Sequence, residues 1–157
     1  MKKGIFTLVI LSIIFALAAC GKSTVEKTET DQTEQAQTEQ APADSLQLLE
    51  NEKAKEYLAD PQGRALYYFK KDEVGKSNCS GDCLANWPAF TQEDFAVQEG
   101  FDKKDFDTIT REDNGEKQVT YKGFPLYYFA KDQQVGDVNG QGVKDVWFVV
   151  NSETDFE

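Results

Sequence analysis

The sequence contains an internal repeat, and this feature constrains the fold more than any other. Residues 63–87 and 123–147 align at an offset of 60, with eight of 25 positions identical. The identical pairs are Gly63/Gly123, Leu66/Leu126, Tyr67/Tyr127, Tyr68/Tyr128, Phe69/Phe129, Lys71/Lys131, Asp72/Asp132 and Trp87/Trp147. Four of these pairs are aromatic, which makes coincidence improbable. Two copies are too few for a solenoid, so we expect two related halves that share one core.

The repeat predicts a mainly β, compact antiparallel domain with little helix. Its two LYYF runs, Leu66–Phe69 and Leu126–Phe129, are short, apolar and aromatic, as is typical of strands covered on both faces. Along such a strand Tyr67 and Phe69 share one face, whereas Leu66 and Tyr68 share the other. Each half is therefore expected to contribute side chains to both faces of its sheet.

The segments around the repeat predict further strands. Asp113-Asn114-Gly115-Glu116 is a hairpin turn between the strands Thr108–Arg111 and Gln118–Tyr121, and the second LYYF run completes a three-strand meander. Pro61-Gln62-Gly63 makes the matching turn after Tyr57–Ala59. Other expected elements are a closing strand at Val146–Val150, one helical turn at Asp102–Phe106, and either a helix or a strand pair over Leu46–Tyr57.

The first 44 residues predict targeting segments rather than a folded domain. Residues 1–19 combine Lys2 and Lys3 with a long apolar run, the layout of an export signal. As a helix this run would reach only about 24 Å, too short for a membrane-spanning anchor, the alternative interpretation. Residues 20–44 are rich in Thr, Glu and Gln, typical of a disordered tether. The repeat-containing domain is expected over 45–157.

The end of the apolar run resembles the lipobox of bacterial lipoproteins. It reads Leu17-Ala18-Ala19-Cys20. The resemblance implies that Cys20 is lipidated, including palmitate, and becomes the first residue of the mature chain. Two or more acyl chains anchor a protein stably. We therefore expect the domain at the outer face of the cell membrane, with the membrane itself as a partner through the lipid.

Composition excludes several functions. The full chain has 17 basic and 28 acidic residues, and removal of Lys2 and Lys3 leaves 15 against 28, a net charge of −13. Such a charge repels phosphate backbones, which argues against nucleic-acid binding. The chain has no histidine, and its one methionine is Met1. The usual zinc and haem ligands and Ser-His-Asp catalysis are therefore excluded.

The repeated Tyr-x-aromatic-x-x-Asp motif is the candidate binding feature. Its members are Tyr67, Phe69, Asp72, Tyr127, Phe129 and Asp132, and the repeated tryptophans Trp87 and Trp147 belong with them. Each aspartate ends a strand, where its carboxylate can accept amide hydrogen bonds from the next turn. That role is structural. The functional alternative is that the paired tyrosines and aspartates line a common ligand cleft.

In these motifs the chain resembles the bacterial lipoproteins that carry a "secreted repeat of unknown function". Other shared stretches are the Ser77, Cys79, Cys83, Trp87-Pro88 segment, the run Gln118–Tyr127 and the loop 136–142. The match spans nearly all of residues 57–150. It implies a location at the cell surface and brings no established reaction with it.

Cys79 and Cys83 predict a disulfide, because an exported protein meets an oxidising compartment. Residues four apart in a helix hold their Cβ atoms about 6 Å apart, and a disulfide needs about 3.8 Å. The bridge therefore requires a tight turn, which Ser80-Gly81-Asp82 suits. The alternative to a structural bridge is a reducible pair with a redox role.

One acidic loop resembles the start of a calcium site. Asp137, Asn139 and Gly142 stand at the first, third and sixth positions of a calcium-loop pattern. Phe148 occupies the position of the bidentate glutamate, so Asp132 or Asp145 would have to replace it. Calcium is the only cofactor that the sequence suggests, and otherwise we expect none.

The sequence thus favours a non-enzymatic surface module, binding or structural, with an unknown protein or small-molecule ligand. The alternative function is an extracytoplasmic redox or electron-transfer accessory that uses Cys79, Cys83 and the aromatic cluster.

Overall fold

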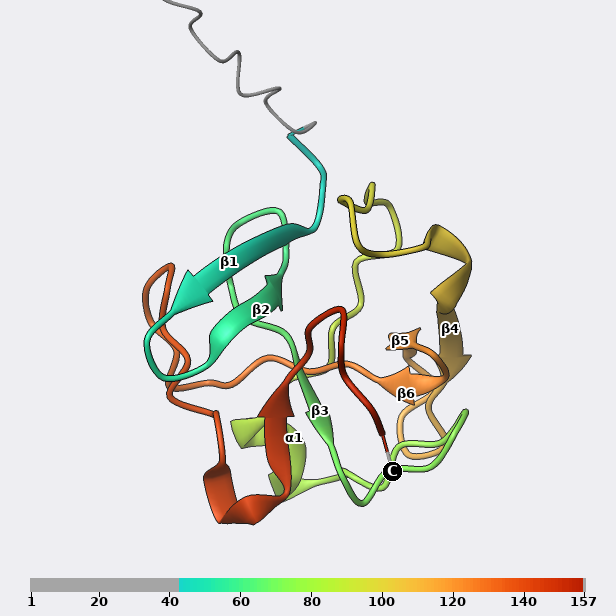
Figure 1. Ribbon diagram of the computed structural model, residues 1–157. Helices are drawn as coiled ribbons and strands as arrows, with labels where there is room; N and C mark the ends of the chain where they lie inside the picture. The colour runs from blue at the N-terminus through green and yellow to red at the C-terminus, as the bar shows by residue number, and fades with distance from the viewer. Residues whose placement is uncertain (1–42, 157) are drawn as a thin grey trace, which may run out of the picture. The chain divides into compact units, whose positions relative to one another are not determined.

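A computed structural model describes residues 43–156 of the chain (Figure 1). The expected leader 1–19, the lipidation site Cys20 and the tether up to residue 42 lie outside the described residues. Within 43–156, no helix has the length and apolar character needed to cross a membrane.

Seven short strands form three antiparallel sheets, so the expectation of a mainly β fold is confirmed. The strands are β1 (Gln47–Asn51), β2 (Lys55–Ala59), β3 (Tyr67–Phe69), β4 (Phe106–Thr110), β5 (Lys117–Tyr121), β6 (Phe124–Pro125) and β7 (Trp147–Val149). The sheet orders are β1-β2, β3-β7 and β4-β5-β6. Figure 1 shows β3 and β7 between the β1–β2 hairpin and the β4–β5–β6 sheet.

Most of the predicted elements are present. The Asp113–Glu116 hairpin joins β4 to β5, β7 closes the fold against β3, and a 3-10 helix occupies Lys103–Asp105. The ambiguous stretch Leu46–Tyr57 forms part of the strand pair β1–β2, not a helix. Its Leu, Glu and Lys residues favour a helix locally. At the end of β2, however, Leu58 points into one hydrophobic core and Tyr57 and Ala59 point into the other, and only a strand allows this alternation.

Two local predictions need correction. The second LYYF run belongs to no ladder, because it divides its hydrogen bonds among three neighbours. Leu126 N–H donates to Val119 O on β5, Tyr127 pairs with Tyr67, and Tyr128 N–H donates to Pro88 O. Helix α1 (Asp82–Asn86) was not expected. A turn at Val143–Asp145 occupies the matching place in the second repeat, and the positive φ of Lys144 and Asp145 shows that it is not a regular helix.

The alternating strand residues divide the interior into two cores. One core contains Leu46, Leu58, Leu66, Phe90, Phe95, Phe106, Val119, Tyr121, Leu126 and Val150. The other contains Tyr57, Ala59, Ala65, Tyr67, Cys79, Trp87, Tyr127, Val138, Trp147 and Val149. Leu66 and Leu126 belong to the first, and Tyr67 and Tyr127 to the second. This is the two-faced burial that the LYYF pattern predicts.

Each repeat also covers a glycine of the other. A Cβ added at Gly63 would lie 2.8 Å from Val135 Cγ1, and one added at Gly123 would lie 2.8 Å from Val74 Cγ1. Both glycines have φ near +80°, a region that residues with a Cβ rarely adopt. The repeated glycine is therefore a turn position over which the other repeat passes closely.

Gly140→Ala should destabilise the domain by about 2 kcal/mol or more, because its Cβ would meet two buried rings. It would lie 2.8 Å from Tyr67 Cε1 and 2.9 Å from Trp87 Cη2. Gly142→Ala is the matched control, since its Cβ meets nothing within 4 Å and only its positive φ opposes the change. Urea unfolding measures both variants. Gly142→Ala should lose no more than about 1–2 kcal/mol, the cost of its positive φ. A loss below about 1 kcal/mol in Gly140→Ala would contradict the close packing at Gly140.

Candidate functional site

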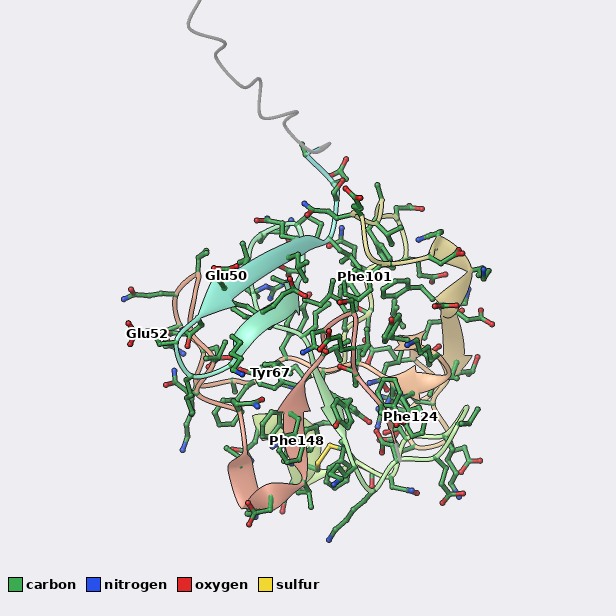
Figure 2. The ribbon with its side chains drawn as sticks, viewed as in Figure 1. Glu50, Glu52, Tyr67, Phe101, Phe124 and Phe148 are labelled. Carbon is green, nitrogen blue, oxygen red and sulfur yellow. A yellow bond between two sulfur atoms is a disulfide. The ribbon has the colours of Figure 1, made fainter. Side chains whose placement is uncertain are left out.

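The two copies of the motif meet through the backbone of their tyrosines. Tyr67 N–H donates to Tyr127 O at 2.8 Å, and Tyr127 N–H donates to Tyr67 O at 2.9 Å. Both side chains are fully buried, and Figure 2 shows Tyr67 in the interior, with Glu50 and Glu52 at the edge of the β1–β2 hairpin. This pair relates the two repeats by an approximate two-fold axis.

The tyrosine of each repeat is hydrogen-bonded to the aspartate of the other. Tyr67 O–H donates to Asp132 Oδ2, and Tyr127 O–H donates to Asp72 Oδ2, both at 2.6 Å. Burial, with the neighbouring carboxylates, raises the pKa of both tyrosines. The hydroxyls therefore stay protonated and serve as donors. We call this arrangement the tyrosine–aspartate exchange.

Each aspartate also holds the loop that follows it, as the sequence predicts. Asn78 N–H donates to Asp72 Oδ1 at 2.6 Å, and Asn139 N–H donates to Asp132 Oδ1 at 2.9 Å. The carboxylate thus joins its own turn to the tyrosine of the other repeat. The structural interpretation of the motif accounts for both aspartates.

The remaining aromatic residues of the motif form a stack of four rings, which we call the aromatic stack. Phe69 stacks on Trp147 with centroids 4.3 Å apart, Trp147 on Trp87 at 3.8 Å, and Trp87 on Phe129 at 4.2 Å. The order alternates between the repeats, so the phenylalanine of one copy always contacts the tryptophan of the other. Tyr67 meets Trp87 edge-on, and Tyr127 meets Trp147 likewise.

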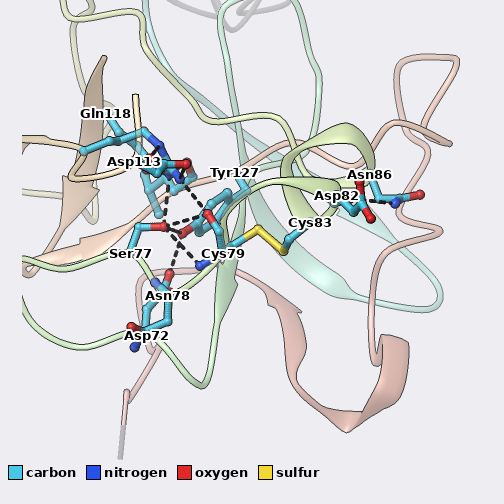
Figure 3. Close-up of a disulfide and its surroundings, with 12 residues drawn as sticks. Asp72, Ser77, Asn78, Cys79, Asp82, Cys83, Asn86, Asp113, Gln118 and Tyr127 are labelled. Atoms are coloured by element: carbon cyan, nitrogen blue, oxygen red, sulfur yellow. Dashed lines mark hydrogen bonds and ion pairs between the residues drawn. A yellow bond between two sulfur atoms is a disulfide. The ribbon is translucent and has the colours of Figure 1, made fainter. Parts of the chain in front are cut away.

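A polar network around Asp72 contains residues that the sequence did not single out. Arg111 is buried, and its guanidinium donates to Ser77 Oγ at 3.0 Å, to Cys79 O at 2.6 Å and to Gln118 Oε1. Ser77 Oγ lies 2.7 Å from Tyr127 Oη, which connects Arg111 to the exchange (Figure 3). Arg111 lies outside both repeat cores, so the repeat alignment gave no signal for it.

The two aspartates differ in environment. Asp72 is 6 % exposed, and this burial raises its pKa to about 6, although Tyr127, Asn78 and Arg111 act in the other direction. Asp132 is half-buried, and its pKa is raised mainly by burial. The groups that lower the pKa of Asp132 are the neutral Tyr67 and Asn139, whereas Asp72 also has a cation, Arg111, acting on it.

Another buried carboxylate forms a separate network on the opposite side of the LYYF run. Asp60 is fully buried and accepts a hydrogen bond from Tyr128 O–H at 2.8 Å. Arg64 forms an ion pair with Asp60 at 2.7 Å and lies over the Tyr128 ring. Arg64 and Arg111 are the two arginines of the chain. Arg64 pairs with the buried Asp60, whereas Arg111 pairs with the partly exposed Asp113 at 3.0 Å and also lowers the pKa of the buried Asp72.

Cys79 and Cys83 form the predicted disulfide, with a Cα–Cα distance of 5.3 Å. Cys79 precedes α1 and Cys83 lies inside it, with Gly81 at positive φ between them. The turn at Gly81 therefore brings the two cysteines closer together than two residues four apart in a regular helix would be. Cys79 is fully buried, and Cys83 is partly exposed.

The predicted calcium residues lie in a turn that uses their oxygens internally. Asp137 Oδ2 accepts from the N–H groups of Gln133 and Gln134, and Asp132 is bound as described above. Asp145 is exposed next to Trp147. Among the described residues, no cluster of three or more acidic or cysteine side chains is placed to hold a metal. Calcium binding stays a prediction.

A cleft of about 590 Å³ lies over the aromatic stack. Rings of the stack contribute to its wall, and Cys83, Val143 and Val146 add further apolar surface. Its polar lining consists of Lys71, Lys131, Lys144, Asp82 and Asn86. Phe69 and Phe129 are only partly buried, so aromatic surface is accessible to a ligand. The motif residues thus split: the tyrosines and aspartates hold the fold, and the phenylalanines and tryptophans reach the cleft.

The lysines of the cleft were not singled out from the sequence, although a signal was present. Lys71 and Lys131 are identical at the repeat offset. They lie in equivalent turns, each closed by a hydrogen bond from the aspartate N–H to the phenylalanine carbonyl, Asp72 to Phe69 and Asp132 to Phe129.

A family model described as a secreted repeat of unknown function matches the chain twice, at residues 51–91 and 107–151. Together the two matches cover more than half of the chain. Each match contains one copy of the Tyr-x-aromatic-x-x-Asp motif. No curated protein and no solved structure shows significant similarity to the chain.

Tyr127→Phe should destabilise the domain more than Tyr67→Phe. The first leaves the buried Asp72 without its hydroxyl donor, for which we expect a loss of about 2–3 kcal/mol. The second leaves Asp132, which water can reach, for which we expect about 1 kcal/mol. Tyr57→Phe is the control, because its buried hydroxyl has no hydrogen-bond partner among the described residues. Chemical unfolding compares the three, and equal losses at positions 67 and 127 would refute this ranking.

Asp72 should make the domain less stable as the pH rises through about 6. Its folded-state pKa of about 6 lies above the unfolded value of about 3.9, so the folded protein binds this proton more tightly. The stabilisation is complete below about pH 4 and is lost above about pH 6, a change of about 2–3 kcal/mol.

Asp72→Asn removes the titrating group and keeps its shape, so it isolates this effect. The free energy of unfolding should vary less between about pH 4.5 and about pH 7.5 in the variant than in the wild type. Self-repulsion of the acidic chain is present in both proteins and cancels in the comparison. Identical pH profiles would show that Asp72 titrates at its ordinary pKa.

Proposed function

Because the chain belongs to the family of secreted repeats of unknown function, we propose that its folded domain is an extracytoplasmic binding module without catalytic activity. The cleft over the aromatic stack is its ligand site. Small-molecule sites are concave, mostly apolar and about 300–1,000 Å³ in volume. The cleft of about 590 Å³, with aromatic surface and a few polar groups, fits this description. That fit carries the proposal.

The absence of enzymatic activity is part of the proposal and rests on the chemistry of the lining. Cys83, the cysteine that lines the cleft, is bonded to Cys79 in the disulfide, and the sequence contains no histidine. A covalent mechanism needs a nucleophile within hydrogen-bond reach of a base. No serine, threonine or free thiol lies among the residues that line the cleft. The potential nucleophiles that do line it, Asp82 and three lysines, are exposed, whereas a nucleophilic lysine is activated by desolvation.

The tryptophans provide a direct test, since Trp87 and Trp147 are the two tryptophans of the chain and both line the cleft. The neutral dye N-phenyl-1-naphthylamine should quench their fluorescence saturably, with one dye bound per chain. Val143→Phe should abolish binding by filling the cleft. Val135→Phe makes the same change at an exposed residue outside the cleft and should bind as the wild type. Unsaturable quenching, or wild-type binding by Val143→Phe, would refute the proposed site.

A redox or electron-transfer accessory is the second candidate, because Cys83 lines the same cleft as the stacked rings. Two observations favour a structural disulfide. Cys79 is fully buried, and its carbonyl oxygen accepts a hydrogen bond from the Arg111 guanidinium. The disulfide therefore fixes the loop that holds the polar network around Asp72. The second repeat has Asn139 and Val143 in place of the cysteines and keeps the aromatic frame.

Cys79→Ala/Cys83→Ala separates the two candidates. We expect this double variant to fold, to lose about 2 kcal/mol of stability, and to bind the dye and complement a deletion strain. Thermal unfolding, dye titration and complementation measure the three properties. A variant that binds the dye but fails to complement would favour the redox function.

We further propose that Cys20 is lipidated and holds the domain at the outer face of the membrane. The Leu17–Cys20 pattern supports this part, and two acyl chains suffice for stable anchoring. Cys20→Ser should release the protein from membrane anchorage and block its maturation. Intact-mass analysis of the wild-type membrane fraction checks it, and an unmodified Cys20 there would be the contrary result.

A further inference from the structure

The lining of the cleft follows the two-fold relation between the repeats, with two exceptions. Ten of its twelve residues form five pairs at the offset of 60, as Lys71 does with Lys131 and Trp87 with Trp147. The exceptions are Asp82 and Lys144, whose counterparts in the other repeat are Gly142 and Leu84. The departures from symmetry are thus both charged residues, of opposite sign.

These two residues give the cleft a positive and a neutral half. One half is built on the Phe69–Trp147 pair, where Lys70 N–H donates to Val146 O, and it contains Lys71 and Lys144. We call it the lysine half.

The other half is built on the Phe129–Trp87 pair, where Ala130 N–H donates to Asn86 O. It contains Lys131 and Asp82, whose charges cancel.

The cleft has a net positive charge, whereas the whole chain has a net negative charge. The chain carries a net charge of −11, yet its cleft has three lysines and one aspartate. None of the three lysine ammonium groups forms an ion pair with another residue of 43–156. Their charges are therefore available to a ligand that enters the cleft.

The backbone at Lys144 is strained. Lys144 and Asp145 have φ values of 53° and 57°, in the left-handed region that costs a residue with a Cβ about 1–2 kcal/mol. Glycine at position 144 would avoid this cost. Lys55 and Lys122 also have positive φ outside the cleft, whereas Lys144 has it within the cleft lining.

We propose that the ligand of this cleft is a small anionic amphiphile, with a flat apolar body against the aromatic stack and its acidic group at the lysine half. The acidic group is a carboxylate, sulfonate or phosphate, which Lys71 and Lys144 bind as point charges. This inference rests on the proposed function and specifies the ligand class for the same site.

Two dyes that differ by one sulfonate test the charge. 8-Anilinonaphthalene-1-sulfonate is anionic, and N-phenyl-1-naphthylamine is its neutral counterpart. Lys71→Gln/Lys144→Gln should weaken the anionic dye about tenfold and the neutral dye less than twofold. Added salt should weaken the anionic dye alone. Asp82→Asn should strengthen the anionic dye. Lys70→Gln, the same substitution at one exposed neighbour outside the cleft, should alter neither.

Lys144→Gly should change stability and dye binding in opposite directions, which a purely structural role of Lys144 would not do. It should raise Tm, because it relieves the positive φ, and at the same time weaken the anionic dye about threefold. If both dyes bind and the lysine variants affect them equally, the charge inference is wrong and the binding site stands. If neither dye quenches the tryptophans saturably, both the site and the inference are overturned.

Discussion

Tyr127 reaches a carboxylate of the first repeat and Tyr67 reaches one of the second, so each half supplies the donor that the aspartate of the other half needs. A buried carboxylate without its donors is strongly destabilising. The first half therefore cannot satisfy the buried Asp72 alone, and the second half alone lacks the hydroxyl donor of Asp132. The domain has two repeats in sequence but one unit in folding, because the contacts that complete each repeat come from its partner.

The aromatic stack follows from this exchange. Once Tyr67 and Tyr127 are paired through their backbones, β3 places Phe69 opposite Trp147, and the second LYYF run places Phe129 next to Trp87. The two tryptophans then meet near the axis with their planes 3° apart. The cleft depends on the same axis, since its paired lining residues come from equivalent positions. The binding surface is thus a product of how the repeats interlock rather than of either repeat alone.

Much of this fold was predictable from the sequence. The alternation in LYYF predicted two covered faces, and the Asp113–Glu116 turn predicted the β4–β5 hairpin, because both signals are local. The exchange of partners was not predictable. A repeat shows which positions are equivalent, but the same sequence allows each tyrosine to bind the aspartate of its own copy. Arg111 was missed for a related reason: it lies outside the repeat cores, and only packing brings it to Ser77 and Cys79.

The covalent link between the repeats has a consequence for recognition. Two identical chains around a true two-fold axis must present identical groups on both sides of that axis. A dimer of single repeats would therefore offer any ligand the same surface in two opposite orientations. Because both copies here belong to one chain, each can diverge separately, as Asp82 and Lys144 have done. Fusion of the repeats gives the cleft a direction, so that a molecule with two unlike ends meets only one orientation that fits.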